Sequence, residues 1–291
     1  MSDGRAQVPG FRSGEGVGPR VALTIAGSDS GGGAGIQADL RTFAAFGVFA
    51  TTAVTAVTAQ NTLGVSGLVA IEPALVVAQV DAVVGDLAPA ATKTGMLAEP
   101  ATVAAVAELV AGGTLGPVVV DPVLVSTSGS ALMGPGGVEA YRELLVPHAS
   151  VLTPNLREAA ALTGRTAEEA ASLAAMTEMA EELRSLGARI VVVKGGHLHS
   201  SAESPDVVAG PQGITVLDAN RVPTANDHGT GCTLSAAIAA ALALGTTPLA
   251  AVSRAKDYVH RALRGARHWR LGAGHGAIDH FGWSCGPESG R

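Results

Sequence analysis

The sequence predicts an α/β fold with a mostly parallel central sheet that is covered by helices on both faces. Strand-like runs rich in Val, Ile and Thr alternate with helix-like runs along most of the chain, which is the order expected of parallel strands joined by helices. Residues 117–123 carry three consecutive valines, and such a run suits a strand that is buried on both faces. A short antiparallel hairpin is expected at residues 207–217.

Length, charge and cysteine content limit the class of protein. The 291 residues suit one large domain or two small ones, and a net charge of −6 argues against binding to nucleic acid or to a membrane surface. Two cysteines are too few for a disulfide framework and fit a reducing compartment. No apolar run reaches the roughly 20 residues that a bilayer requires. We therefore expect a cytoplasmic protein with a disordered tail at 1–20, one domain at 21–281 and a second tail at 282–291.

The individual elements follow from local signals. Thr and Val enrichment predicts a strand at 49–59, and Pro73 and Pro100 suit the first turns of helices at 72–84 and 99–110. The other expected strands are residues 21–27, 91–97, 117–123, the start of 150–158, 189–193, 207–209 and 214–217. The other expected helices open at residue 36, follow Asn155, cover 168–186, follow residue 232 and cover 248–269.

A polar, glycine-rich loop at residues 28–35 joins the first strand to the first helix. Open α/β sheets bind ligands at such strand–loop–helix junctions. The loop lacks the spacing of the dinucleotide fingerprint and the lysine of a Walker-type loop. A flexible surface turn is the alternative interpretation.

The chain is organised around residues 226–232, in which Gly229 and Gly231 flank Thr230 and Cys232 follows directly. An alanine- and leucine-rich helix comes next, so its unpaired N–H groups would form an anion site for a phosphate. A helix start also favours a thiolate, so we expect a lowered pKa for Cys232. This pattern predicts a phosphoryl-transfer centre. A glycine loop that caps a buried helix, with Cys232 as a small core residue, fits equally well.

Polar side chains end two of the predicted strands. Gln60 offers a donor and an acceptor side by side, which suits a heteroaromatic ring with an exocyclic nitrogen. Asp121 ends the valine-rich strand, where α/β sheets place their chemistry. The alternatives are a polar strand end for Gln60 and a helix or turn cap for Asp121.

Three further residues suit binding of phosphate and metal. Asn155 and Glu158 are three positions apart, so a first helical turn would bring the amide and the carboxylate together. Lys194 ends another strand and could neutralise phosphate charge. The alternatives are a helix start with a favourably placed acid and a solvated lysine. The eight histidines show no spacing typical of structural zinc.

Taken together, these stretches resemble the hydroxymethylpyrimidine/phosphomethylpyrimidine kinases of thiamine biosynthesis, in the ribokinase-like superfamily. The resemblance covers residues 21–281, about nine-tenths of the chain, and its motifs occur in the family's order. These motifs are LTIAGSDSGGGAGIQAD (23–39), TAQNT (58–62), KTGML (93–97), DPV (121–123), TPNLRE (153–158), VKGGH (193–197) and HGTGCT (228–233). Any one motif is weak evidence, whereas the ordered set is specific.

The resemblance implies a three-layer sandwich and ATP-dependent phosphorylation of 4-amino-5-hydroxymethyl-2-methylpyrimidine and then of its monophosphate. It implies ATP and Mg²⁺ as cofactors and a homodimer. Residues implied to bind or line the pocket for the pyrimidine are Gln60, Gly27, Ala34, Asp39, Met96 and Val123. Residues implied to face nucleotide phosphates are Lys194, Asn155 and Thr230, with Glu158 and Asp121 as magnesium ligands. Gly229, Thr230 and Gly231 would form an anion hole, and Cys232 would act as general base through its thiolate.

Two positions depart from the family pattern. Thr127 stands where some members carry lysine, and Ala277 replaces the usual proline in GHGAIDH (274–280). Two rival functions remain open on the sequence. One is a pyridoxal or pyridoxine kinase of the same superfamily, because that substrate also carries a hydroxymethyl group. The other is a non-catalytic regulator that binds a pyrimidine.

Overall fold

In the computed structural model, which describes residues 18–125, 132–166, 168–196, 198 and 203–285, nine strands form one sheet. Their order across the sheet is β3-β2-β1-β4-β5-β6-β7-β8-β9. The strands are β1 (Val21–Asp29), β2 (Phe49–Asn61), β3 (Gly64–Ala70), β4 (Ala91–Thr94), β5 (Val118–Val120), β6 (Val151–Leu152), β7 (Val191–Lys194), β8 (Asp206–Gly210) and β9 (Gly213–Leu217).

The centre of the sheet is parallel and both of its edges are antiparallel. Strands β2, β1, β4, β5, β6 and β7 run in the same direction. The predicted β8–β9 hairpin adds antiparallel pairs at one edge. At the other edge β3 pairs antiparallel with β2, and this strand was not expected. Its glycines, Gly64 and Gly67, weaken the strand pattern in the sequence.

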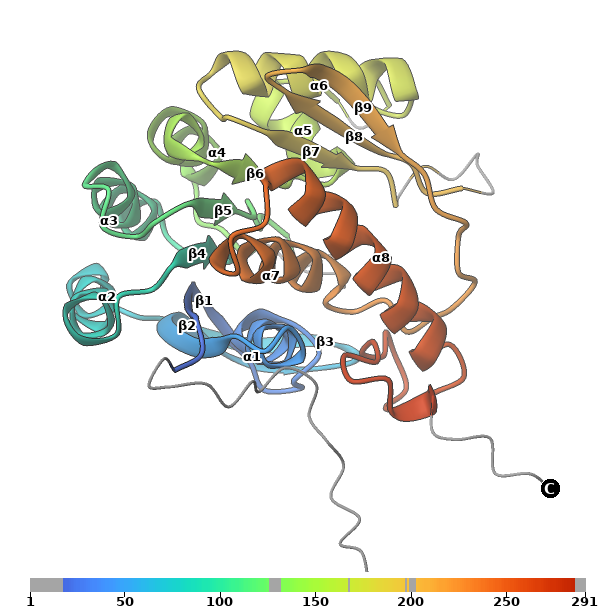
Figure 1. The fold of residues 1–291 in the computed structure, drawn as a ribbon, viewed down its shortest axis with the longest axis horizontal. Coiled ribbons are helices and arrows are strands. Elements are labelled where there is room, and N and C mark those ends of the chain that lie inside the picture. The colour runs from blue at the N-terminus through green and yellow to red at the C-terminus, as the bar shows by residue number, and fades with distance from the viewer. Residues whose placement is uncertain (1–17, 126–131, 167, 197, 199–202, 286–291) are drawn as a thin grey trace, which may run out of the picture.

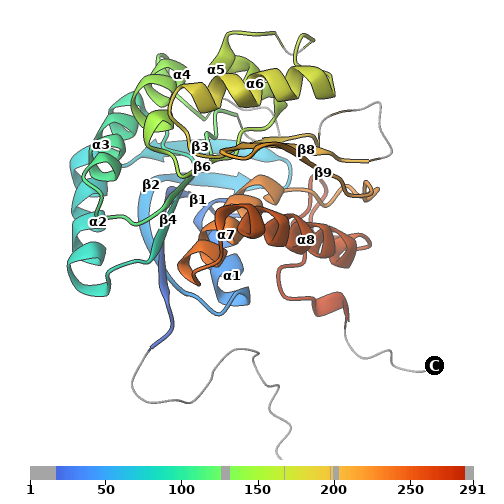
Figure 2. The same ribbon diagram turned by 45° about the horizontal axis from the view of Figure 1, so that its top comes forward.

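Helices cover both faces of the sheet and make three layers, as Figures 1 and 2 show. One face carries α1 (Gly35–Ala45), α7 (Thr230–Ala243) and α8 (Pro248–Ala266). The other face carries α2 (Pro73–Leu87), α3 (Pro100–Ala111), α4 (Gly137–Ala140), α5 (Leu156–Thr163) and α6 (Leu173–Ser185). The predicted α/β class with a mostly parallel, doubly covered sheet is confirmed.

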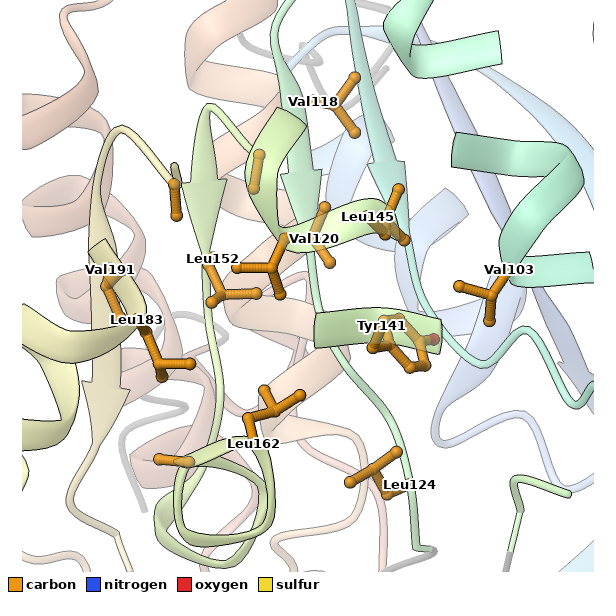
Figure 3. Close-up of a cluster of buried hydrophobic side chains, with 14 of the residues drawn as sticks. Val103, Val118, Val120, Leu124, Tyr141, Leu145, Leu152, Leu162, Leu183 and Val191 are labelled. Carbon is orange, nitrogen blue, oxygen red and sulfur yellow. The ribbon is translucent and has the colours of Figure 1, made fainter. Parts of the chain in front are cut away.

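Two hydrophobic cores explain why the central strands read as continuous apolar runs. In β5, Val118 and Val120 face the core that holds α3 and α5, whereas Val119 faces the core that holds α7 and α8. Side chains alternate between the faces of a strand, so burial of both faces requires every residue to be apolar. Figure 3 shows the first core, in which Tyr141 packs among valine and leucine side chains.

Several predicted helix bounds were wrong. The helix expected from residue 168 begins at Leu173, because the Ser172 side chain accepts the N–H of Ala175 and caps the helix there. Helix α8 ends at Ala266, three residues before the expected end. A π-helical turn at Tyr141–Leu145 was not expected.

No helix in the described ranges is both long enough and apolar enough to cross a membrane. Position 127, His197, most of the N-terminal tail and the last six residues lie outside the described residues. The division into one domain at 21–281 with two tails stays a prediction.

Candidate active site

A cavity of about 590 Å³ opens at the carboxyl ends of the parallel strands, beside the start of α7. This is the edge at which open α/β sheets bind ligands. The cavity brings together all but one of the residues expected at the site. These residues are Gly27, Ala34, Gln60, Met96, Asp121, Val123, Asn155, Glu158, Lys194, Gly229, Thr230, Gly231 and Cys232.

One end of the cavity is built from β1, β2 and the segment after β4. A Cβ atom at Gly27 would overlap the methyl group of Met96, so glycine makes room for this side chain. The Gln60 amide lies at the end of β2, with its oxygen 3.2 Å from Thr58 Oγ1 and its nitrogen 3.4 Å from His228 Nε2. This end therefore combines an apolar wall with one amide that can both donate and accept.

Asp39 does not line the cavity, and the expectation that it does so was wrong. Its carboxylate is fully buried and lies 2.8 Å from Lys93 Nζ and 2.7 Å from Thr24 Oγ1. Lys93, which the sequence analysis assigned no role, lines the cavity in its place. A buried carboxylate needs a charged partner, and Lys93 on β4 supplies it.

The two glycine loops touch each other. Gly229 has a φ of +85°, and a Cβ atom there would overlap the carbonyl oxygen of Gly33. Both the left-handed conformation and the close approach require glycine at this position. The loop expected to bind phosphate is therefore packed directly on the loop that follows β1.

Asp29 holds these two loops together and was missed by sequence reasoning. Its buried carboxylate accepts the N–H groups of Gly31 (2.8 Å), Gly33 (3.1 Å) and Ala34 (2.8 Å), and lies 2.9 Å from His228 Nε2. Burial by itself raises the pKa of Asp29, but the His228 and amide hydrogen bonds outweigh it and lower that pKa. A carboxylate directly after a strand and before glycines is the signal that could have identified it.

The start of α7 presents backbone donors to the cavity. Thr230 N–H donates to Asp227 O at 3.3 Å and Thr233 N–H donates to Gly229 O at 2.8 Å. In the described part of the chain, the N–H groups of Gly231 and Cys232 have no backbone acceptor. These two donors at a helix start suit an anion.

Lys194 stands over this helix start. Its Nζ lies 2.9 Å from Asp121 Oδ1 and 3.9 Å from Glu158 Oε2. A Cβ atom built on Gly231 would lie 3.2 Å from the same Nζ, so the ammonium is close to the loop. The alternative that Lys194 is a solvated lysine is wrong, because only 14% of its side-chain surface is exposed.

The two carboxylates near Lys194 differ in their environments. Burial raises the pKa of Glu158 to about 7, with Asp121 adding to the shift and Lys194 opposing it. Burial also acts on Asp121, but Lys194 and Lys93 outweigh it and hold its pKa below the ordinary range. Asp121 also accepts hydrogen bonds from Thr153 and Ser235. At neutral pH, Glu158 is the carboxyl that can exchange a proton for another cation.

Asn155 and Glu158 form a capping box at the start of α5. The Asn155 side chain accepts the Glu158 N–H at 3.0 Å, and Glu158 Oε2 accepts the Asn155 N–H at 2.7 Å. The pair therefore caps the start of a helix, as the alternative interpretation predicted, and both residues also line the cavity. No cluster of three or more His, Cys, Asp or Glu side chains suited to a metal occurs within the described ranges.

The expectation of a lowered pKa for Cys232 was wrong. Burial raises the pKa of the thiol to about 11, although the nearby Lys93 charge acts in the opposite direction. The thiol is partly accessible from the cavity and is otherwise enclosed by protein. Desolvation outweighs the helix start here because an enclosed thiolate loses its hydration, and the carboxylates of Asp39 and Asp121 act in the same direction.

The segment after α8 supports the phosphate loop from outside. His228 N–H donates to Gly276 O at 3.0 Å, and Gly276 N–H donates to Ala225 O at 3.2 Å. Ala277 and His228 form an isolated parallel β-bridge. The departure at Ala277 therefore lies against the loop. Among the described backbone hydrogen bonds, none uses the Ala277 N–H, so the family's proline could occupy the position without losing a donor there.

Comparisons with known proteins agree with this geometry. Residues 29–279 match the family model for phosphomethylpyrimidine kinase. The hydroxymethylpyrimidine/phosphomethylpyrimidine kinase of Rhizobium meliloti is 50% identical over 262 residues, which cover 90% of this chain and 97% of that protein.

Two solved structures share the fold. The phosphomethylpyrimidine kinase of Clostridium difficile is 38% identical, with a TM-score of 0.73 over 84% of this chain and 99% of that one. The pyridoxal kinase of Staphylococcus aureus, in complex with AMP-PCP and pyridoxal, is 32% identical, with a TM-score of 0.82 over 92% and 95% of the two chains. On the match over most of its length, the chain belongs to the phosphomethylpyrimidine kinase family.

Proposed function

We propose that this protein is an ATP-dependent kinase that phosphorylates 4-amino-5-hydroxymethyl-2-methylpyrimidine and then its monophosphate, for thiamine biosynthesis. One observation supports this most strongly. A single cavity holds an amide-bearing pocket around Gln60 at one end and a helix start beside Lys194 at the other, with Cys232 on its wall. Phosphoryl transfer needs little more than such positioning and charge stabilisation.

The pyrimidine pocket would orient the reacting hydroxymethyl group. The Gln60 amide can donate to a ring nitrogen and accept from the exocyclic amine beside it at the same time. Gly27, Ala34, Met96 and Val123 provide a mostly apolar wall for the ring. In this pose the hydroxymethyl group points toward the start of α7.

The phosphate end would stabilise the charge that develops on the transferring group. The N–H groups of Gly231 and Cys232 and the ammonium of Lys194 converge there, and a preorganised set of donors costs no reorganisation during the reaction. Asn155 can donate its amide N–H while its oxygen stays in the capping box. The Thr230 hydroxyl is one further donor for a phosphate oxygen.

Glu158 and Asp121 are the residues that would hold Mg²⁺. Both carboxylates line the cavity beside Lys194, and magnesium is commonly bound by one or two carboxylates plus substrate phosphates. The raised pKa of Glu158 fits this assignment, because burial disfavours the ionised carboxylate and a bound cation would favour it. When bound, the ion would neutralise charge on the phosphate oxygens.

Cys232 would face the hydroxymethyl group, but its role as a thiolate base is weakened by its pKa of about 11. A loose phosphoryl-transfer transition state requires little proton removal before the transfer. A positioned base contributes about 10²–10⁴-fold to a rate. We therefore expect Cys232→Ala to lower kcat by less than about 100-fold, and a larger loss would restore the base role.

We also infer a homodimer and a cytoplasmic location. The outer strands β2 and β3 carry exposed apolar side chains, including Val57 and Val69, which are paired across the two strands. Such a patch at a sheet edge is suited to association. Light scattering should give twice the mass of one chain for the wild type and the mass of one chain for Val57→Lys. Use of ATP fits a cytoplasmic location.

Pyridoxal is the second candidate substrate. The Staphylococcus aureus pyridoxal kinase superposes with a higher TM-score than the Clostridium difficile phosphomethylpyrimidine kinase, 0.82 against 0.73. Both substrates carry a hydroxymethyl group on a six-membered heteroaromatic ring, so the backbone does not decide between them.

A coupled ADP-release assay with Mg-ATP tests the proposal. It offers hydroxymethylpyrimidine, its monophosphate and pyridoxal in parallel. Turnover of both pyrimidines with little turnover of pyridoxal is the expected result. Preference for pyridoxal would contradict the proposed pyrimidine substrate and would leave the proposed phosphate site unchanged. Binding of the pyrimidine without any turnover would favour a non-catalytic regulator.

A further inference from the structure

Asp29 and His228 lie between the two ends of the cavity, and neither has a part in the proposed phosphoryl transfer. Asp29 ends β1 and His228 precedes the glycines at the start of α7, 199 positions further along the chain. Both side chains are almost fully buried, with 4% and 10% of their surfaces exposed. A buried carboxylate is costly unless hydrogen bonds satisfy it, and His228 supplies one of these bonds to Asp29 at the wall of the cavity.

The pair connects the two glycine loops rigidly. Asp29 Oδ2 accepts Gly33 N–H and Ala34 N–H and also contacts His228 Nε2. A Cβ atom at Gly33 would overlap the His228 ring, so the ring is seated directly on the first loop. Any movement of that loop is therefore transmitted to the residue that precedes Gly229.

The pair also reaches the pyrimidine end through Gln60. Because the Asp29 carboxylate accepts from His228 Nε2, this nitrogen carries a proton. Thr58 Oγ1 lies 2.8 Å from Ser28 O and 3.2 Å from Gln60 Oε1, and its single proton serves one of these two acceptors at a time. The Nε2 proton of His228 is directed at Asp29, so the Gln60 amide, whose nitrogen lies 3.4 Å from His228 Nε2, is a packing contact of the imidazole ring. The Gln60 amide and the His228 ring are therefore neighbours, so a ligand that fixes the amide also restricts the ring.

We infer that Asp29 and His228 are positioning residues that couple occupancy of the pyrimidine pocket at Gln60 to the geometry of the phosphate-binding loop at Gly229–Gly231. The inference rests on the proposed function for the identity of the two ligands. A ring held by Gln60 stabilises the hydrogen bonds of His228, and those bonds hold the loop in place for the phosphate. Each ligand then tightens the binding of the other by the same factor.

The test compares two amide variants that differ in reach. In His228→Gln the amide nitrogen can occupy the place of Nε2 and donate to Asp29. His228→Asn is one methylene shorter and cannot reach. His268→Ala is the control, because His268 is exposed and does not line the cavity. Calorimetry measures the Kd of Mg-AMP-PCP with and without hydroxymethylpyrimidine, and the ADP-release assay measures kcat.

We expect the pyrimidine to tighten AMP-PCP binding by about fivefold or more in the wild type and in His228→Gln. In His228→Asn that factor should fall to about one, with each ligand still bound alone, and kcat should fall by about 10–100-fold. Retained coupling in His228→Asn, loss of coupling in His228→Gln, or no coupling in the wild type would overturn the inference. Absence of wild-type turnover would instead overturn the proposed function, because the binding measurement does not depend on turnover.

Discussion

The enclosed thiol of Cys232 predicts alkylation that is slow at neutral pH and rises steeply with pH. Burial raises its pKa to about 11, so roughly one molecule in ten thousand carries the thiolate at pH 7. An ordinary thiol with a pKa near 8.5 carries about 3% thiolate at that pH, which is a difference of roughly 300-fold. Only the thiolate reacts, and a thiolate of higher pKa is the stronger nucleophile, so the rate constant should lie below that of a free thiol by about 20-fold.

The assay is mass-spectrometric detection of iodoacetamide adducts in a Cys285→Ser background, which leaves Cys232 as the single cysteine. The rate constant should rise about tenfold for each pH unit from 7 to 10, because ionisation is far from complete over that range. Cys232 lines the cavity and is partly exposed, and a parallel measurement on the urea-unfolded chain separates the effect of access from that of ionisation. A rate that levels off near pH 7 would refute the burial argument and would return Cys232 to the position of a ready thiolate base.

Three further predictions concern the loop, the phosphate end and the C-terminal segment. Gly229→Ala should lower Tm and abolish most turnover, because the added Cβ atom meets the Gly33 carbonyl oxygen. Gly245→Ala is the control, because Gly245 has a similar φ of +83° and no atom within 4 Å of an added Cβ. Calorimetric unfolding of Gly245→Ala should show only the cost of the left-handed backbone conformation, about 1–2 kcal/mol. Lys194→Met should lower kcat/KM for ATP by roughly 10–100-fold in steady-state kinetics, since it removes one charge-assisted contact to phosphate; an unchanged value would contradict its assignment. Burial lowers the pKa of His280 to about 4, so below pH 6.5 the unfolded chain binds a proton that the folded chain does not. The free energy of unfolding in urea should therefore fall between pH 8 and pH 4, and the fall should be about 3 kcal/mol larger in the wild type than in His280→Gln.

Much of the fold was predictable because it follows from local patterns. The parallel strands appear as apolar runs, and prolines at the starts of α2 and α3 mark those helices. Edge strand β3 was missed because it is glycine-containing and exposed, and its existence depends on pairing with β2. The start of α6 was misplaced because Ser172 caps the helix in a stretch whose composition favours helix on both sides.

Most of the candidate site was also predictable, because its residues belong to ordered motifs at strand ends and helix starts. Asp39 was the exception. Its place in a motif does not reveal that its carboxylate is fully buried against Lys93, 54 positions later in the chain. Asp29 and His228 were present in the motifs, but their hydrogen bond joins segments 199 positions apart and is visible only once the chain is folded.

The sequence by itself determined the α/β class, the order of the elements and the glycine loop that begins α7, because periodicity and glycine content act through the local backbone. The tertiary structure decided the charge state of Cys232, the partner of Asp39 and the joining of the two glycine loops. These properties depend on desolvation and on contacts between distant segments. Burial is a sum over every element that surrounds a group, so a helix start that favours a thiolate in isolation is outweighed here by the protein enclosing it.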